Sequence, residues 1–385
     1  MTASEESMNI NKKRLAATFT SLCETDSPSR MEGNMAAEMK KIFTALNPDE
    51  SFEDDSATVT GSESGNLFFR FTGTAEKEPL FFNCHMDTVQ PGVGVRVQRD
   101  GDIFTSAGNT ILGSDDKSGI AALIEAMRVI REHDLAFRPV EFIFTTCEEI
   151  GLLGAKALDP GHIRAKFGYA LDSSGFGRVI IGAPASNRLS ITIHGVAAHA
   201  GLHPEWGINA MVLAGQALAQ APCGRIDEQS TVNFGTIEGG TASNIVPEKV
   251  VIEGEVRSHS QQRLDQLTRE VEESFVLTIA DWQDPTGTAK GRPSIDFTSE
   301  LDFPLMRLDR EDAVIIEVER AAGAIDMELD FEVAGGGSDA NILNGYGLET
   351  AIIATGMTHV HSTKEQVSLQ DMTDLTRLIL SLLTL

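Results

Sequence analysis

The stretch that decides the fold is Val140-Glu-Phe-Ile-Phe-Thr-Thr-Cys-Glu-Glu149. Its first part, Val140–Thr145, is mainly apolar and rich in aromatic and β-branched residues, which predicts a buried strand. Glu148 and Glu149 follow almost at once, and acids beside an apolar strand are costly unless they are solvated, paired or bound to a metal. Ligands of open α/β sheets bind at the carboxyl ends of strands, so the two acids indicate a binding site, with a solvated turn as the alternative.

Residues that can bind metals also follow other predicted strands: His85 and Asp87 after Leu80–Cys84, Asp172 after Tyr169–Leu171, and His361 after Ala351–Ala354. Each of these alone is compatible with an ordinary polar turn. The carboxyl ends of parallel strands meet at one edge of a sheet, however. We therefore expect these side chains to gather there with the two glutamates.

A further acidic pair lies where a loop leads into a predicted helix, in Gly113-Ser-Asp-Asp-Lys-Ser-Gly119. Acids at this position suit the helix dipole and can cap free amide groups, which is the alternative to a ligand role. Two adjacent acids cannot both cap well. The pair therefore offers one carboxylate, Asp115 or Asp116, to the same site.

The chemistry of this set indicates a catalytic metal centre. Imidazoles and carboxylates without thiolates suit zinc, cobalt or manganese rather than a closed structural site. Asp87, two residues after His85, can hold the imidazole nitrogen that does not bind metal. The cysteines form no CxxC pair and are expected to be thiols, with Cys84 and Cys147 as small buried residues.

Strands alternating with helices predict an α/β fold with a mostly parallel sheet, and the helical spacing is seen at 11–23, 35–46, 117–130, 313–322 and 369–383. Past Gly182 the pattern changes. Strands at 190–194, 232–237 and 250–257 with helices at 210–220 and 263–277 predict a small α+β sandwich. We expect a catalytic domain in two parts, 1–184 and 299–385, interrupted by an inserted domain at 185–298.

The composition excludes some classes of function. The chain of 385 residues carries a formal net charge of −26, so its surface repels phosphate backbones and nucleic acid is not an expected partner. No segment reaches the roughly 18 apolar residues of a membrane span. The start of the chain is polar and lacks the apolar run of a secretory signal, which predicts a cytoplasmic protein.

At this point the motifs resemble a known group, the di-zinc metallopeptidase family that includes peptidase T, aminoacylase and glutamate-releasing carboxypeptidases. The matching pieces run in family order across nearly the whole chain: His85-Met-Asp87, Gly113-Ser-Asp-Asp-Lys-Ser-Gly119, Glu148-Glu-Ile-Gly151, Asp172, His199-Ala-Gly201, Gly239-Gly-Thr-Ala-Ser-Asn-Ile-Val-Pro247 and His361-Ser-Thr-Lys-Glu365. Within that family the sequence looks most like the peptidase T-like members, on the motifs Gly113-Ser-Asp-Asp-Lys117 and Gly335-Gly-Gly-Ser-Asp339.

The resemblance implies a role for each matching residue. Two divalent metal ions, zinc first and cobalt or manganese as alternatives, would be bound by five ligands: Asp115 as the bridge, His85 and Asp172 at one site, and Glu149 and His361 at the other. Glu148 would be the general base, and Asp87 would orient His85.

The resemblance also implies that the inserted domain is a lid and dimerisation domain, which predicts a homodimer. His199 would stabilise the oxyanion, and Asn244 and Arg257 would hold the polar end of the substrate. Arg257 is apt because a guanidinium binds carboxylate in a bidentate way, although an ordinary strand-edge charge is the alternative. Gly337 could let substrate approach the backbone closely, or could belong to a plain flexible turn.

The expected function is therefore that of a zinc-dependent exopeptidase, an aminopeptidase or tripeptidase acting on short peptides through a metal-activated water. A deacylase or aminoacylase acting on N-acyl amino acids is an alternative, because the motifs do not separate the two substrate classes. A metal-binding relative without catalysis is a second alternative. The intact acidic set, including Glu148, favours an enzyme.

Overall fold

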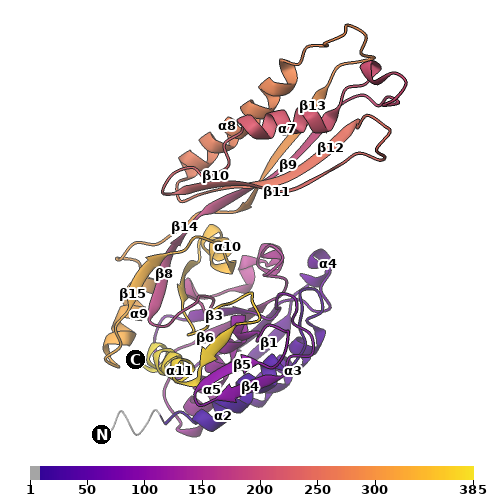
Figure 1. Cartoon of the computed structure of the whole chain (residues 1–385). Helices are drawn as coiled ribbons and strands as arrows, with labels where there is room; N and C mark the ends of the chain where they lie inside the picture. Colours follow the sequence, from indigo (N-terminus) through magenta and orange to yellow (C-terminus); the bar gives the residue numbers. More distant parts are fainter. Residues whose placement is uncertain (1–8) are drawn as a thin grey trace. The chain divides into compact units, whose positions relative to one another are not determined.

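The computed structural model describes residues 9–385, so the first eight residues of the polar start lie outside the described part. It divides into two compact units (Figure 1). The first unit comprises the chain up to Gly182 and again from Met306 to Leu385, and the second comprises Ala183–Leu305. No helix within residues 9–385 is long and apolar enough to cross a membrane.

A nine-stranded sheet forms the centre of the first unit, in the order β1-β2-β6-β3-β7-β16-β8-β14, with β15 paired to β8. Its strands are β1 (Glu50–Glu53), β2 (Leu67–Phe71), β3 (Leu80–His85), β6 (Val140–Thr145), β7 (Phe167–Ala170), β8 (Arg178–Ala183), β14 (Met306–Arg307), β15 (Asp330–Val333) and β16 (Glu349–Ile353). The middle strands β6, β3, β7 and β16 run parallel, while β1 and β2 are antiparallel. The predicted α/β fold with a mostly parallel sheet is confirmed.

Strands β3 and β6 are buried along their whole length. This burial explains their nearly continuous apolar runs, because a central parallel strand is covered on both faces. The long helix α5 packs against β3 and also contacts helices α2 and α11. The helices of this unit are α2 (Lys12–Cys23), α3 (Gly33–Ala45), α4 (Ala57–Thr60), α5 (Ser114–Glu132), α6 (Leu153–Ala157), α9 (Ala313–Gly323), α10 (Asp339–Gly345) and α11 (Leu369–Thr384).

A small three-stranded sheet, in the order β17-β5-β4, completes the first unit. Its strands are β4 (Val97–Asp100), β5 (Ile103–Ser106) and β17 (Gln366–Ser368). Strand β17 directly follows the segment that contains His361 and leads into α11. Its antiparallel pairing with β5 therefore fixes the end of that segment.

The second unit is a five-stranded antiparallel sheet, in the order β10-β11-β12-β9-β13, against which two helices pack. Its elements are β9 (Ala185–His194), α7 (Ala210–Gln220), β10 (Gly224–Arg225), β11 (Ser230–Gly239), β12 (Lys249–Ser258), α8 (Gln261–Ala280) and β13 (Ser294–Phe303). Burial alternates along β9, so that Leu189, Ile191 and Ile193 face the core while their neighbours do not. This is the pattern of a sheet covered by helices on one face.

Strand β13 is the main element that the sequence did not predict. It is an edge strand paired with β9 along most of its length, and most of its residues are exposed or half-buried. An edge strand needs few apolar side chains, and β13 contains many polar residues. Its sequence therefore lacks the apolar pattern that would have predicted a strand. The strand runs past Thr298, where the sequence placed the end of the inserted domain, and the compact unit ends at Leu305.

Candidate metal centre

The candidate ligands of the first unit come from the carboxyl ends of neighbouring strands. His85 is the last residue of β3, Glu148 and Glu149 lie just after β6, and Asp172 lies just after β7. Asp115 is in the first turn of α5, where its backbone departs from helical geometry and its peptide bond to Asp116 is cis.

Asp115 lies between two imidazoles, one at each of its carboxylate oxygens. Its Oδ1 is 3.0 Å from Nε2 of His85, and its Oδ2 is 3.2 Å from Nε2 of His361. The same nitrogen of His361 is 3.0 Å from Oε2 of Glu149. Ligand atoms of His85, Asp115 and Glu149 all lie within 4.8 Å of one another. The structure therefore gathers side chains that are up to 276 residues apart in the sequence, from His85 to His361.

Asp116, the other member of the acidic pair, has a different environment. It is fully buried, and its Oδ2 accepts a hydrogen bond from the backbone N–H of His85 at 3.3 Å. Burial raises its pKa well above the usual range. The imidazoles thus face Asp115 and not its neighbour.

Glu365 holds the loop that carries Asp115. This carboxylate is only 2% exposed. Its Oε2 accepts from the backbone N–H groups of Leu112 and Gly113 at 2.8 and 2.9 Å. Its Oε1 accepts from the Ser114 hydroxyl at 2.6 Å and from the Asp115 N–H at 3.1 Å. Four donors on one carboxylate fix the start of α5, and with it the position of Asp115.

Two further buried carboxylates hold the loop after β6. Asp87 accepts from the N–H groups of Glu148 at 2.9 Å and Glu149 at 3.3 Å, and from the Ser29 hydroxyl at 2.6 Å. Glu32, which is fully buried, accepts from the N–H of Cys147 at 3.0 Å. The two neighbouring glutamates are therefore anchored through their backbone, which leaves their side chains available to the centre.

The contact between Asp87 and His85 differs from the sequence interpretation in one detail. Nδ1 of His85 lies 2.9 Å from the backbone carbonyl oxygen of Asp87 and 3.5 Å from its carboxylate. The closer partner is thus the main chain, which is a common way to fix a metal-binding imidazole. The Asp87 carboxylate stays within ion-pair distance of the ring, so its orienting role remains a prediction, and it also orders the glutamate loop.

The centre is crowded with buried acids. Burial, together with the charge of Asp172, raises the pKa of Glu148 well above its usual range. Burial, together with the charges of Asp115 and Glu149, raises the pKa of Asp172 in the same direction. Burial, together with the charge of Asp87, raises the pKa of Asp339, at the start of α10, to about 6. Clustered carboxylates of this kind are stable when cations compensate their charge.

Unpartnered oxygens support the same conclusion. Oε1 of Glu149 and Oδ1 of Asp339 are buried and have no hydrogen-bond partner among the described residues. Imidazole nitrogens and carboxylate oxygens are the donor set of catalytic zinc, and the exposed edge of His361 keeps the centre open. The residues present therefore fit a divalent metal site.

The residues predicted for oxyanion and substrate contacts lie mostly in the second unit. His199 is exposed, and its Nδ1 accepts from the N–H of Gly201 at 3.1 Å, so the neutral ring carries its proton on Nε2. Asn244 lies in the turn before Ile245, and its carbonyl accepts from the Ala200 N–H. His199 and Asn244 belong to the second unit, whereas the candidate metal ligands belong to the first.

Arg257 lies on β12, where its Nη2 donates to Glu255 at 2.9 Å and its guanidinium lies over the ring of Phe303. Its Nε is buried and has no hydrogen-bond partner among the described residues. Gly337 belongs to the first unit, where it directly precedes Ser338, the N-cap residue of α10. Gly337 is thus close in sequence to Asp339 of the acidic cluster.

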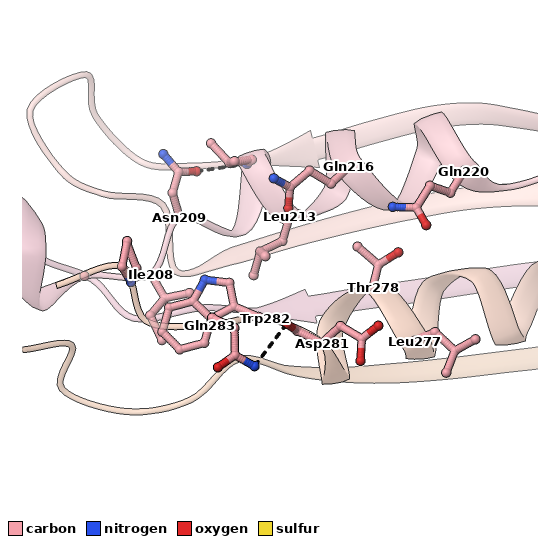
Figure 2. A pocket seen from close by; sticks show the side chains of 13 residues that line it. Ile208, Asn209, Leu213, Gln216, Gln220, Leu277, Thr278, Asp281, Trp282 and Gln283 are labelled. Atoms are coloured by element: carbon pink, nitrogen blue, oxygen red, sulfur yellow. Dashed lines mark hydrogen bonds between the residues drawn. The ribbon is translucent and has the colours of Figure 1, made fainter. Parts of the chain in front are cut away.

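The second unit also has a solvent-open groove of about 720 Å³ between α7 and α8. Figure 2 shows Gln216 and Gln220 of α7 facing Thr278 of α8, with Trp282 near one end. None of the predicted site residues lines this groove. It is therefore not the candidate catalytic site, and the strand ends of the first unit are.

The sequence reasoning missed Glu32 as a positioning residue, and it used Glu365 only as part of a motif. No local pattern distinguishes either glutamate from a solvated one. Each glutamate is far in sequence from the residues whose position it fixes. Glu365, for example, contacts a loop 250 residues earlier in the chain, so no local motif indicates its positioning role. The one feature of the sequence that could have indicated the role of Glu365 is its position four residues after the candidate ligand His361.

Parts of the chain match two protein-family models. Residues 182–276 match the peptidase dimerisation domain model, and residues 66–187 match the model of peptidase family M28. The crystal structure of aminopeptidase PepT from Bacillus cereus is 37% identical, with a TM-score of 0.86 over 97% of this chain and 98% of that one. The chain belongs to the M20 family of peptidases, in the group that contains peptidase T.

Two further relatives of this M20 peptidase match nearly its whole length. The protein YqjE of Bacillus subtilis is 36% identical over 97% of this chain and 98% of its own length. A tripeptidase structure from Staphylococcus aureus is 32% identical, with a TM-score of 0.88 over 97% of this chain and 98% of that one. The predicted class of enzyme, a peptidase T-like hydrolase acting on peptide bonds, is thereby confirmed.

Proposed function

We propose that this M20 peptidase is a two-metal exopeptidase that removes a residue from the end of a short peptide. The observation that carries the proposal is the position of Asp115, which presents each carboxylate oxygen to a different imidazole. A carboxylate placed in this way can bridge two cations, each of which would also bind one of the imidazoles.

The ligand set that we propose follows from this arrangement. His85 and Asp172 would hold one cation, Glu149 and His361 the other, and Asp115 both. Zinc is the metal that best suits these nitrogen and oxygen ligands, with cobalt and manganese as alternatives. When bound, such ions supply a water of lowered pKa and polarise the carbonyl group of the substrate.

Glu148 is the proposed general base. Its backbone is fixed by Asp87, and its carboxylate is one of the acids of the centre that the ligand set leaves unused, with Asp116 and Asp339 as others. It would accept a proton from the water that attacks the amide carbon. As the carbon–nitrogen bond breaks, it would deliver that proton to the leaving amine. The products are then a carboxylic acid and a free amine.

His199 is the proposed donor to the oxyanion, through its Nε2–H. The match of residues 182–276 to a peptidase dimerisation domain supports a homodimer. In such a dimer the imidazole could act at the site of the other subunit. Asn244, Arg257 and Gly337 are proposed substrate contacts, with Arg257 suited to a peptide carboxylate.

A short peptide is the proposed substrate because similar proteins of known structure are described as an aminopeptidase and a tripeptidase. Assaying dipeptides, tripeptides and N-acetyl amino acids side by side separates this proposal from a deacylase. Release of the first residue from tripeptides is expected. Preferential hydrolysis of the N-acetyl compounds would contradict it. The cytoplasmic location stays a prediction.

The decisive experiment is the variant Glu148→Ala, measured for both metal content and turnover. We expect metal content near that of the wild type and a rate about 10²- to 10⁴-fold lower, the usual contribution of a general base. Glu76→Ala, at an exposed position of the same unit, is the matched control. Full activity in Glu148→Ala would exclude the general-base role.

A mixing experiment tests the role of His199. Dimers that combine one Glu148→Ala subunit with one His199→Ala subunit contain one site with both groups intact if the imidazole acts on the partner subunit. Activity recovered in such mixed dimers, relative to each parent, is the expected result. Verified mixed dimers without activity would exclude action across the dimer.

A further inference from the structure

A second pocket lies in the first unit, at the amino ends of the parallel strands. It has a volume of about 350 Å³. Lys77 lies in the loop just before β3, Arg138 lies just before β6, and Phe167 is the first residue of β7. Glu78, next to Lys77, and four residues of α9 complete the lining: Ala313, Ile316, Glu317 and Arg320.

This pocket is remote from the metal centre. The carboxyl ends of the same three strands carry His85, the Glu148–Glu149 pair and Asp172. Strands β3 and β6 each have six residues, so about 20 Å of sheet separates the two ends. A ligand in the pocket would therefore not contact the reacting groups.

The pocket carries an excess of positive charge on a chain whose formal net charge is −26. Three cationic side chains, Lys77, Arg138 and Arg320, line it together with two acidic ones, Glu78 and Glu317. Oε2 of Glu317 already accepts from Arg138 at 2.9 Å and from Arg320 at 2.7 Å. One carboxylate oxygen thus serves both guanidinium groups.

Lys77 has no comparable partner. Its Nζ is buried and has no hydrogen-bond partner among the described residues. Burial and the charges of Arg320 and Arg138 lower the pKa of Lys77, as expected where cations gather without enough counter-charge. A buried ammonium group that makes no hydrogen bond is costly, and an incoming anion would remove that cost.

The pocket also has an apolar and rigid part. The guanidinium of Arg138 lies 5.4 Å from the ring centroid of Phe167, and Arg138 is itself only 2% exposed. Arg138 also donates from Nε to the carbonyl oxygen of Glu78 at 2.7 Å. Ile316, which is 51% exposed, offers an apolar side chain at the rim. Positive groups and an apolar surface therefore lie side by side.

We propose that this pocket binds a small organic anion, with a carboxylate head paired to Lys77 and Arg320 and a short apolar tail against Phe167 and Ile316. The two cations supply charge-assisted hydrogen bonds to the head, and the volume accommodates an alkyl tail of the length found in octanoate. The site is independent of the proposed function, because it uses none of the catalytic residues.

The test is a calorimetric titration of the full-length, metal-saturated protein with octanoate. Octan-1-ol and octylammonium, which share the tail but lack the negative charge, are the ligand controls. We expect saturable binding of octanoate alone, weakened about tenfold or more in Lys77→Met and in Arg320→Gln. Lys13→Met, an exposed lysine of α2, should bind octanoate as the wild type does.

Each other outcome contradicts the proposal. Equal binding of octan-1-ol would show that the pocket binds alkyl chains without selecting for a negative charge. Absence of octanoate binding would show that the pocket is not an anion site. Octanoate binding that survives in both variants would place the carboxylate elsewhere, for example at the metals. Arg320 is 49% exposed in its side chain, so Arg320→Gln keeps the test valid if Lys77→Met fails to fold.

Discussion

The substitution Glu365→Gln tests how the protein holds the bridging carboxylate in place. It keeps the shape of the side chain but replaces one acceptor oxygen by an NH₂ donor. Within residues 9–385 the hydrogen-bond partners of Glu365 are all donors: the N–H groups of Leu112, Gly113 and Asp115, and the hydroxyl of Ser114. An amide therefore cannot satisfy all of them in either orientation.

The magnitude follows from the better of the two orientations. With the NH₂ group on the side of Ser114, that hydroxyl can rotate to accept, and the N–H of Asp115 alone loses its partner. Hydrogen bonds to a charged group are worth about 1.5–3 kcal/mol, and a buried unpaired donor costs about 1–3 kcal/mol. We expect Glu365→Gln to lower the free energy of unfolding by about 2–4 kcal/mol.

The function should suffer as well, because Asp115 is next to the broken contact. Changes in the groups that orient metal ligands usually cost about 10- to 100-fold in metal affinity or activity. Equilibrium unfolding in urea and titration of the metal-free protein with zinc measure the two effects. Glu328→Gln, at an exposed position, should stay within about 0.5 kcal/mol of the wild type.

The reasoning would be refuted by a Glu365→Gln protein with wild-type stability and wild-type zinc affinity. Loss of stability with unchanged zinc affinity would refute only the claim that Glu365 positions a metal ligand. The start of α5 would then keep its geometry without these hydrogen bonds.

Three further outcomes are expected. Prolonged chelation should abolish peptide hydrolysis, and zinc, cobalt or manganese should restore it; hydrolysis that survives complete metal removal would contradict the metal centre. At pH 8 a thiol reagent should label Cys223 quickly and the other three cysteines slowly. Cys23, Cys84 and Cys147 are buried, and burial raises the pKa values of their thiols. Mass spectrometry of the labelled peptides measures the labelling rates, and rapid labelling of Cys23 would contradict the prediction. Phe275→Ala should destabilise the second unit by about 3–5 kcal/mol, since the ring is fully buried in the core of that unit; unfolding in urea measures the change, and a loss below about 1 kcal/mol would show that the core repacks.

The convergence of the candidate ligands could be predicted because it depends on topology. Buried runs at Leu80–Cys84 and Val140–Thr145 indicate parallel strands, and parallel strands place their carboxyl ends at one edge. The choice of Asp115 over Asp116 rested on the family resemblance. The structure supplies its physical basis, since only Asp115 faces the imidazoles.

Other features could not be predicted from the sequence. The edge strand β13 has too few apolar residues to stand out, and its pairing with β9 depends on a partner about 108 residues earlier. Glu365 and Glu32 look like any surface glutamate until the fold buries them. The contact between the His85 ring and the backbone carbonyl of Asp87 could not be predicted, because a backbone group does not depend on the type of side chain.

The division into two units has a practical consequence for spectroscopy. The chain has two tryptophans and two tyrosines, and they are segregated. Trp206 and Trp282 lie in the inserted unit, whereas Tyr169 and Tyr346 lie in the other. Excitation at 295 nm therefore reports on one unit alone.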